Sequence, residues 1–169
     1  DEFFAQVFPE DSQDIAYEIP GVCMVPGEGQ DKSMLLFGSG GNGKSRYLAM
    51  VRAFMGKGNT SALSLHRLEA ERFSVSRLMG KLANICPDLP SEHLAGTSVF
   101  KSITGRDAIS GEYKFRDSFD FEPFVLLIFS ANHLPRSKDG SDGFFDRWLV
   151  VPFMKTFRGN KNEIPAEHL

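Results

Sequence analysis

Eight residues, 38 to 45, constrain the fold of this chain more than any other segment. They follow the complete pattern G-x-x-x-x-G-K-[ST] and read Gly38, Ser39, Gly40, Gly41, Asn42, Gly43, Lys44 and Ser45. The apolar run 34–37 leads into them as a buried strand would, and apolar residues recur behind them at helical spacing between Tyr47 and Met55. A strand, this loop and a helix in that order predict a P-loop, which binds the phosphates of a nucleotide.

The chemistry expected of this loop follows from its backbone and from its last two residues. Glycines allow backbone N–H groups to curl around phosphate oxygens, and the positive end of the following helix adds to that attraction. We expect Lys44 to reach the β- and γ-phosphates and Ser45 to ligate Mg²⁺. Residues 38–45 are therefore predicted to bind a nucleoside triphosphate, with ATP and Mg²⁺ as the cofactors.

The composition of the chain indicates one globular domain. Its 169 residues and 41% apolar content suffice for a core, and no apolar run is long enough to span a membrane. The acidic N-terminus does not resemble a signal peptide, and the absence of an initiator Met leads us to expect a segment of a larger protein. Two separated cysteines, Cys23 and Cys86, favour neither a disulfide framework nor a metal site, so we expect a reducing, cytoplasmic setting.

The hydrophobic pattern divides the chain near residue 30. Residues 1–30 predict one or two short helices and a linker, and residues 31–169 predict an α/β domain whose mainly parallel sheet is flanked by helices. Beyond the loop, the pattern predicts a short strand at 62–65, an interrupted helical segment at 66–79, a buried strand at 81–86, a β-hairpin at 107–122, and strands at 125–130 and 148–153.

Hydrolysis of a triphosphate also needs a carboxylate near the metal ion and a group that positions the attacking water. Asp88 follows the buried strand at 81–86 and is the best candidate for holding Mg²⁺, although Asp is also common in turns. Glu92 is a weaker rival for activating water. Asn132 ends the strand at 125–130, and its amide can donate and accept hydrogen bonds at once, so it could touch the γ-phosphate and the water together.

Cationic side chains outside the loop are candidates for catalysis in a ring and for binding nucleic acid. Arg147 precedes the last strand, where it is either a surface residue or, in a ring, an arginine finger for a neighbour's nucleotide. Lys114 and Arg116 flank Phe115 near the tip of the predicted hairpin and suit a nucleic-acid backbone, unless the tip is only a solvated turn. The net charge of −3 argues against a free-standing, strongly basic nucleic-acid binder but leaves a ring open.

Five segments in order resemble the superfamily-3 helicases, in particular the phage and plasmid primase–helicase group. The first is the loop with its strand, and the second is residues 78–85 leading to Asp88. The others read Phe-Lys-Ser-Ile-Thr-Gly-Arg-Asp at 100–107, Phe-Ser-Ala-Asn-His-Leu-Pro at 129–135, and Asp-Arg-Trp-Leu-Val-Val-Pro-Phe at 146–153. The resemblance covers residues 33 to 157.

The resemblance implies an AAA+-like ATPase that forms a ring, a homo-hexamer in its full-length parent, and moves along DNA during replication in a bacterial or phage-infected cell. Residues 38–45 are then the Walker A motif, Asp88 the Walker B acid and Asn132 the polar sensor. Arg147 matches the finger that acts on the neighbouring subunit. Lys114 falls in the DNA-facing hairpin, with Arg116 beside it and Lys101 in the segment that leads to it.

Two matters stay open on the sequence alone. Many relatives carry paired acids in the Walker B motif where this chain has Pro87 and Asp88, so the water-activating acid is either Asp88 or Glu92. The leading hypothesis is an ATP-driven DNA helicase module without membrane contact. A small-molecule kinase and a non-catalytic module that binds nucleotide as an assembly switch are the alternatives.

Overall fold

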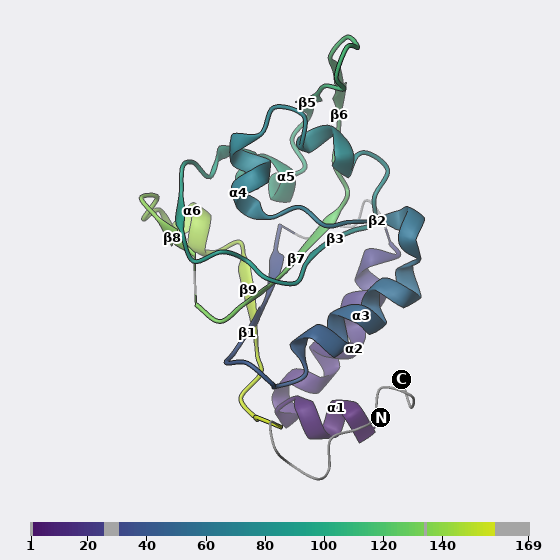
Figure 1. The fold of residues 1–169 in the computed structure, drawn as a ribbon, viewed down its shortest axis with the longest axis vertical. Helices are drawn as coiled ribbons and strands as arrows, with labels where there is room; N and C mark the ends of the chain where they lie inside the picture. Colours follow the sequence, from purple (N-terminus) through teal and green to yellow (C-terminus); the bar gives the residue numbers. More distant parts are fainter. Residues whose placement is uncertain (1, 26–30, 134, 158–169) are drawn as a thin grey trace.

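Short apolar runs alternate with amphipathic segments along this chain, and they assemble into a five-stranded parallel sheet with helices on both faces. The computed structural model describes residues 2–25, 31–133 and 135–157. The strand order is β2-β3-β7-β1-β9, and every strand pairs in parallel (Figure 1). The bounds are β1 Ser33–Phe37, β2 Thr60–Ser61, β3 Ala83–Cys86, β7 Leu126–Ala131 and β9 Trp148–Pro152. The predicted α/β fold is confirmed.

Six α-helices are described, together with three short 3₁₀ turns and two small ladders outside the sheet. The helices are α1 Glu2–Val7, α2 Gln13–Cys23, α3 Lys44–Met55, α4 Leu65–Ala70, α5 Ser98–Gly105 and α6 Asp142–Phe145. The 3₁₀ turns are η1 Glu10–Ser12, η2 Lys57–Asn59 and η3 Val75–Leu78. Strands β5 Ile109–Gly111 and β6 Phe119–Phe121 form the expected antiparallel hairpin, and β4 His93–Leu94 pairs with β8 Arg136–Ser137. No helix in the described ranges has the length and hydropathy to cross a membrane.

The strand predicted at 62–65 was wrong, because the strand there is β2 and Leu65 already begins α4. Ser64 caps that helix, its hydroxyl accepting a hydrogen bond from the backbone N–H of Arg67 at 3.2 Å. Leu63 and Leu65 are both fully buried. An apolar pattern of this length records burial and does not separate a strand from the first turn of a buried helix.

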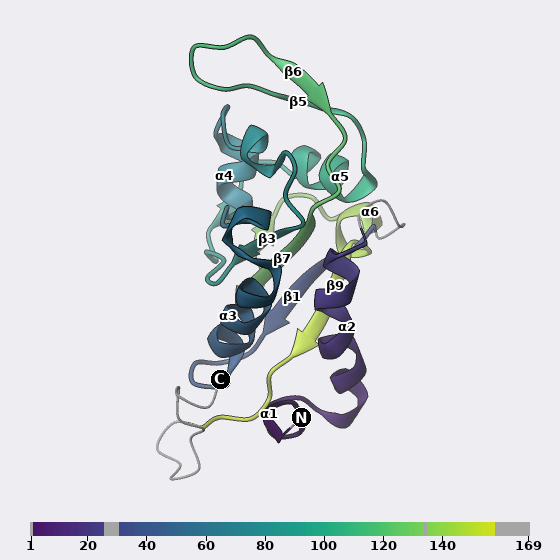
Figure 2. The ribbon, with the colours of Figure 1, turned by 90° about the vertical axis from the view of Figure 1, so that its right-hand side faces the viewer.

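The two faces of the sheet carry separate hydrophobic cores, since successive strand residues point to opposite sides. Met34 and Leu36 of β1 pack with α1, α2 and α3, whereas Leu35 packs with α4, α5 and α6. Helices α1 and α2 therefore bury their apolar side chains in the same core as α3, and Figure 2 shows them beside β9.

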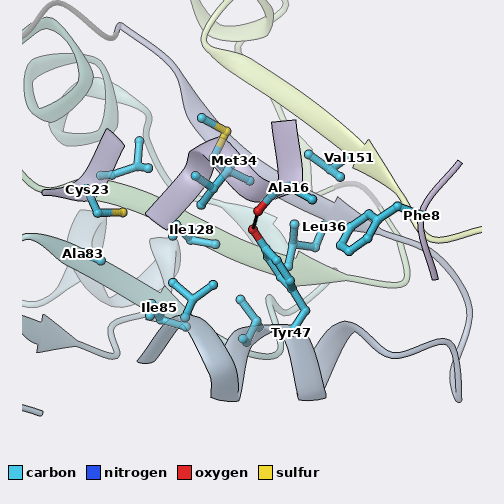
Figure 3. Packing of buried hydrophobic residues seen from close by; sticks show 14 of the residues in the cluster. Phe8, Ala16, Cys23, Met34, Leu36, Tyr47, Ala83, Ile85, Ile128 and Val151 are labelled. Carbon is cyan, nitrogen blue, oxygen red and sulfur yellow. Dashed lines mark hydrogen bonds between the residues drawn. The ribbon is translucent and has the colours of Figure 1, made fainter. Parts of the chain in front are cut away.

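A proline within α2 makes that core depend on a buried tyrosine. Pro20 has no N–H to donate to the carbonyl of Ala16, one turn earlier in the helix. The hydroxyl of Tyr47, from α3, donates to that carbonyl at 2.7 Å, and both residues are completely buried (Figure 3). The contact satisfies the orphaned carbonyl and joins two helices.

The parallel sheet brings the carboxyl ends of β1, β7 and β9 together. The register pairs Phe37 with Ala131 and with Pro152, so β1, β7 and β9 end level with one another. Their carboxyl ends lie at the end of the molecule that holds α1, while the β5–β6 hairpin projects from the opposite end (Figures 1 and 2). Ligands of open α/β sheets bind outside the carboxyl ends of the strands.

Candidate nucleotide-binding site and hairpin

The phosphate-binding loop runs closely against the neighbouring strands, which explains its glycines. The N–H of Gly38 donates to the carbonyl of Ala131 at 3.2 Å, and a Cβ on Gly38 would lie 2.3 Å from the carbonyl oxygen of Phe153. Gly43 precedes α3 with φ of 94°, a left-handed conformation that favours glycine. Any larger residue at position 38 would push the loop away from β9.

A buried amide and one backbone contact fasten the loop to the segment after β9. Asn42 is 2% exposed, and its Nδ2 donates to the carbonyl of Phe153 at 3.0 Å. The N–H of Phe157 donates to the carbonyl of Gly41 at 2.8 Å. These contacts fix the conformation of the loop before any ligand binds. Less conformational entropy is therefore lost when a ligand binds.

Lys44 lies at the floor of the site, 6% exposed. Its ammonium donates to the carbonyls of Gly38 at 2.5 Å and Ser39 at 2.8 Å, and to the side-chain oxygens of Asn42 at 3.0 Å and Asn132 at 3.3 Å. Burial lowers the pKa of Lys44, and the nearby carboxylate of Asp88 opposes that shift. The ammonium is held where it can exchange these oxygens for phosphate oxygens.

Asp88 and Asn132 reach the same cleft as the loop. Asn132 directly follows β7, the immediate neighbour of β1, and Asp88 lies two residues beyond β3, one strand further away. The cleft has a volume of about 570 Å³. Its lining residues are Phe3, Gln6, Val7, Gly40, Gly41, Asn42, Gly43, Lys44, Ser45, Arg46, Pro87, Asp88, Ser130, Asn132 and Phe157.

The lining suits a nucleotide-bound Mg²⁺ better than an all-protein metal cage. Ser45 and Asp88 both line the cleft, and no group of three or more His, Cys, Asp or Glu in the described part of the chain could hold a metal ion. Mg²⁺ in nucleotide sites is held by one or two protein oxygens, by phosphates and by waters. The hydroxyl and carboxylate present fit that donor set.

Asp88 is the only carboxylate among the described residues that line this cleft. Glu92, the other acid considered from the sequence, is exposed, and its backbone carbonyl contacts Nε2 of His66 at 3.0 Å. The geometry therefore places Asp88, and not Glu92, beside Lys44 and Ser45.

Arg147 lies at the amino ends of the strands, whereas the cleft lies at their carboxyl ends. Its carbonyl accepts from the N–H of Ser33 at the start of β1, about 17 Å along the strand from Gly38. Its guanidinium donates from Nε to the hydroxyl of Thr104 at 2.9 Å and from Nη1 to the carbonyl of Gly143. Within one chain, Arg147 is not brought together with Lys44, Asp88 and Asn132.

Lys101 is engaged in an ion pair on the surface of α5. Its ammonium lies 2.6 Å from Oδ2 of Asp139 and 3.1 Å from the hydroxyl of Ser141. These contacts, with Lys101 first and the hydroxyls of Ser141 and Thr97 after it, hold the pKa of the Asp139 carboxyl below its ordinary value. Lys101 lies outside the hairpin, and its charge is balanced by a local acid.

The tip of the β5–β6 hairpin presents two exposed cations and one aromatic ring. Phe115 is 92% exposed, and the ammonium of Lys114 lies 4.9 Å from its ring centroid. Lys114 and Arg116 are also exposed. Phe115 has φ of 65°, an uncommon conformation for a bulky residue, so neither burial nor local backbone preference explains a phenylalanine here.

Sequence reasoning missed seven residues that line the cleft: Arg46, Pro87 and Ser130 lie within two positions of predicted site residues, and four others come from distant segments. Phe3, Gln6 and Val7 come from α1, and Phe157 follows β9. The apolar residues among them signalled only core positions in the sequence, and Gln6 carried no signal. The packing of α1 against β9, with the rings of Phe8 and Phe153 4.7 Å apart, brings them to the cleft.

Comparison with known sequences identifies a family and several viral relatives. The model of a family of unknown function (DUF5906) matches residues 36–147, more than half of the chain. A putative helicase of Acanthamoeba polyphaga mimivirus is 26% identical over 163 residues, which cover 92% of this chain and 17% of the relative. A putative helicase of Frog virus 3 (isolate Goorha) is 27% identical over 176 residues, 98% of this chain and 18% of the relative. The chain spans less than a fifth of these relatives.

Solved structures share the fold at low sequence identity. The apo structure of the NrS-1 C terminal region has a TM-score of 0.71 and 12% identity, with 96% of this chain and 39% of that chain covered. A structure of JCV helicase has a TM-score of 0.59 and 16% identity, with 90% and 43% covered. The predicted resemblance to helicases is confirmed to this extent: the chain is similar in sequence to proteins named putative helicases, and it shares its fold with these solved structures.

Proposed function

The chain belongs to the family of unknown function DUF5906, and we propose that it is an ATP-hydrolysing helicase or translocase module that acts on DNA. The observation that carries the proposal is the convergence of Lys44, Asp88 and Asn132 on one cleft. The putative-helicase relatives support the same reading, and membership of the family by itself assigns no activity.

In the proposed reaction, each cleft residue has one task. The loop amides and Lys44 would hold the β- and γ-phosphates, and Ser45 and Asp88 would hold Mg²⁺, which would supply positive charge beside the transferred phosphoryl group. Asn132 orients the attacking water and contacts the γ-phosphate. Among the described residues that line the cleft, Asp88 is the one acid that could hold the metal ion.

The hairpin is the proposed DNA contact. Lys114 and Arg116 would neutralise backbone phosphates, and the ring of Phe115 would stack on an exposed base. The hairpin leads directly into β7, whose last residue precedes Asn132. The proposed DNA contact is therefore joined through β7 to the residue that contacts Lys44.

Arg147 is proposed to act on a neighbouring copy in a ring, a hexamer in the longer protein. Arg147 lies at the amino ends of the strands, remote from the cleft of its own chain. This position supports a role at the nucleotide of a neighbouring copy and argues against a role at its own nucleotide. The contacts with Thr104 and Gly143 use two of the five N–H donors and leave both N–H groups of Nη2 and one of Nη1 outside the bonds described here. These two bonds would orient the guanidinium before two subunits associate.

ATP hydrolysis with and without single-stranded DNA tests the proposal. Wild-type protein is expected to be stimulated by DNA, Lys44→Ala to lose nucleotide binding, and Phe115→Ala and Lys114→Ala to lose the stimulation. Phe54→Ala is the matched control, because Phe54 is 62% exposed on α3, away from the hairpin. Equal rates with and without DNA in the wild type would refute the DNA-motor function.

Mixing of variants tests the shared site. Arg147→Ala is expected to bind ATP without turnover, and mixing it with Asp88→Ala is expected to restore hydrolysis at interfaces that combine an intact cleft with an intact finger. Circular dichroism of Arg147→Ala controls for the fold, since Arg147 joins α5 and α6. Normal turnover by purified Arg147→Ala would refute the finger assignment.

A further inference from the structure

Phe3, Gln6 and Phe157 line the nucleotide cleft without belonging to any phosphate-binding element. We propose that they form the nucleoside half of the site, in which Phe3 and Phe157 contact an adenine ring and Gln6 reads its edge. This inference rests on the proposed function and adds to it the base that the site selects.

The strand order determines which end of the cleft receives the base. Asp88 comes from β3 on one side of β1, whereas Phe157 follows β9 on the other side, where α1 also packs (Figure 2). The metal and γ-phosphate groups thus occupy the side of Asp88 and Asn132. A triphosphate lying along the loop directs its sugar and base toward α1.

The aromatic side chains lie against the loop itself. A Cβ on Gly43 would be 3.7 Å from Cε2 of Phe3 and 3.1 Å from Cγ2 of Val7. Phe157 is fixed by its N–H to the carbonyl of Gly41. Both phenylalanine side chains are partly exposed, whereas Val7 is buried. They leave apolar surface facing a cleft whose volume of about 570 Å³ lies in the range of small-molecule sites.

Gln6 supplies the polar group that distinguishes one base from another. Gln6 is half-buried, and its Nε2 donates to the carboxylate of Glu2 at 3.1 Å. A glutamine amide pairs with adenine through one donor and one acceptor, at N6 and N7. Hypoxanthine, with a carbonyl in place of the 6-amino group, offers two acceptors along that edge and cannot form the same pair.

The experiment compares binding of Mg-ATP, Mg-inosine triphosphate and Mg-tripolyphosphate by calorimetry. Wild type is expected to bind ATP more tightly than either of the others. Phe3→Ala is expected to weaken the binding of ATP about 5- to 150-fold, which is the range for loss of a base–aromatic contact. The affinity for tripolyphosphate is expected to stay within about twofold of wild type. Gln6→Ala is expected to bind ATP and inosine triphosphate equally. Phe54→Ala serves as the control.

The outcomes separate this inference from the function on which it rests. Equal wild-type affinity for ATP and tripolyphosphate would overturn the nucleoside subsite while leaving the phosphate site intact. An equal loss of affinity for ATP and for tripolyphosphate in Phe3→Ala would also overturn the nucleoside subsite, because the side chain would then act only by supporting Gly43. If neither ligand binds to wild type, the proposed nucleotide function fails first.

Discussion

The bond between Tyr47 and Ala16 gives a quantitative test of how α2 tolerates its internal proline. Tyr47→Phe removes only the hydroxyl that donates to the Ala16 carbonyl at 2.7 Å, in a completely buried setting. Because Pro20 cannot donate to that carbonyl, the variant leaves a buried acceptor without a partner. The expected loss in the free energy of unfolding is about 1–3 kcal/mol.

A double-mutant cycle separates this bond from general packing. Pro20→Ala restores an N–H one helical turn beyond Ala16, so the carbonyl gains its ordinary helical donor. In that background Tyr47→Phe is expected to cost less, with a coupling energy of about 1 kcal/mol. Urea unfolding followed by far-UV circular dichroism and by the fluorescence of the single tryptophan, Trp148, measures each free energy.

Tyr113→Phe is the matched control. Its hydroxyl donates to the carbonyl of Ser76 at 3.3 Å, but its side chain is 40% exposed and water can replace it. The expected change is within about 0.5 kcal/mol. The same cost for Tyr47→Phe with and without Pro20 would refute the account of α2 given above.

Two further predictions concern buried polar groups. Asn84→Ala is expected to destabilise the fold by about 2–4 kcal/mol and lower the thermal midpoint, because Asn84 bonds both the N–H and the carbonyl of Leu63, at 2.8 and 2.9 Å. Asn84→Asp, which buries a carboxylate facing the Leu63 carbonyl, is expected to cost at least as much at neutral pH, and an unchanged midpoint in Asn84→Ala would contradict the assignment. Burial raises the pKa of the Cys23 thiol from 9.0 to about 12, so the unfolded chain loses this proton first and stability falls as the pH rises from 9 to 12. The slope from this thiol approaches about 1.4 kcal/mol per pH unit, and urea titrations at several pH values should show it removed in Cys23→Ala; equal slopes for the two proteins would argue against it.

The sequence by itself determined the parts that depend on neighbouring residues. The loop at 38–45, its strand and its helix were predictable because glycine spacing and hydrophobic periodicity are local properties. The hairpin and the strands β7 and β9 were predictable for the same reason. The strand at 62–65 was misplaced because a run of buried apolar residues looks alike in a strand and in the first turn of a helix.

The tertiary structure decided which side chains meet. Strand order places Asn132 within reach of Lys44, and the parallel direction of β9 places Arg147 at the amino ends of the strands, away from the cleft. Neither fact is encoded in spacing along the chain, since β1 pairs with residues 94 positions away in β7 (Met34 with Ile128) and 115 positions away in β9 (Ser33 with Trp148). Packing of α1 on β9 added Phe3 and Gln6 to the cleft. Local hydrogen bonding and periodicity produce the elements, whereas contacts between distant segments decide the site, and only the folded chain contains those contacts.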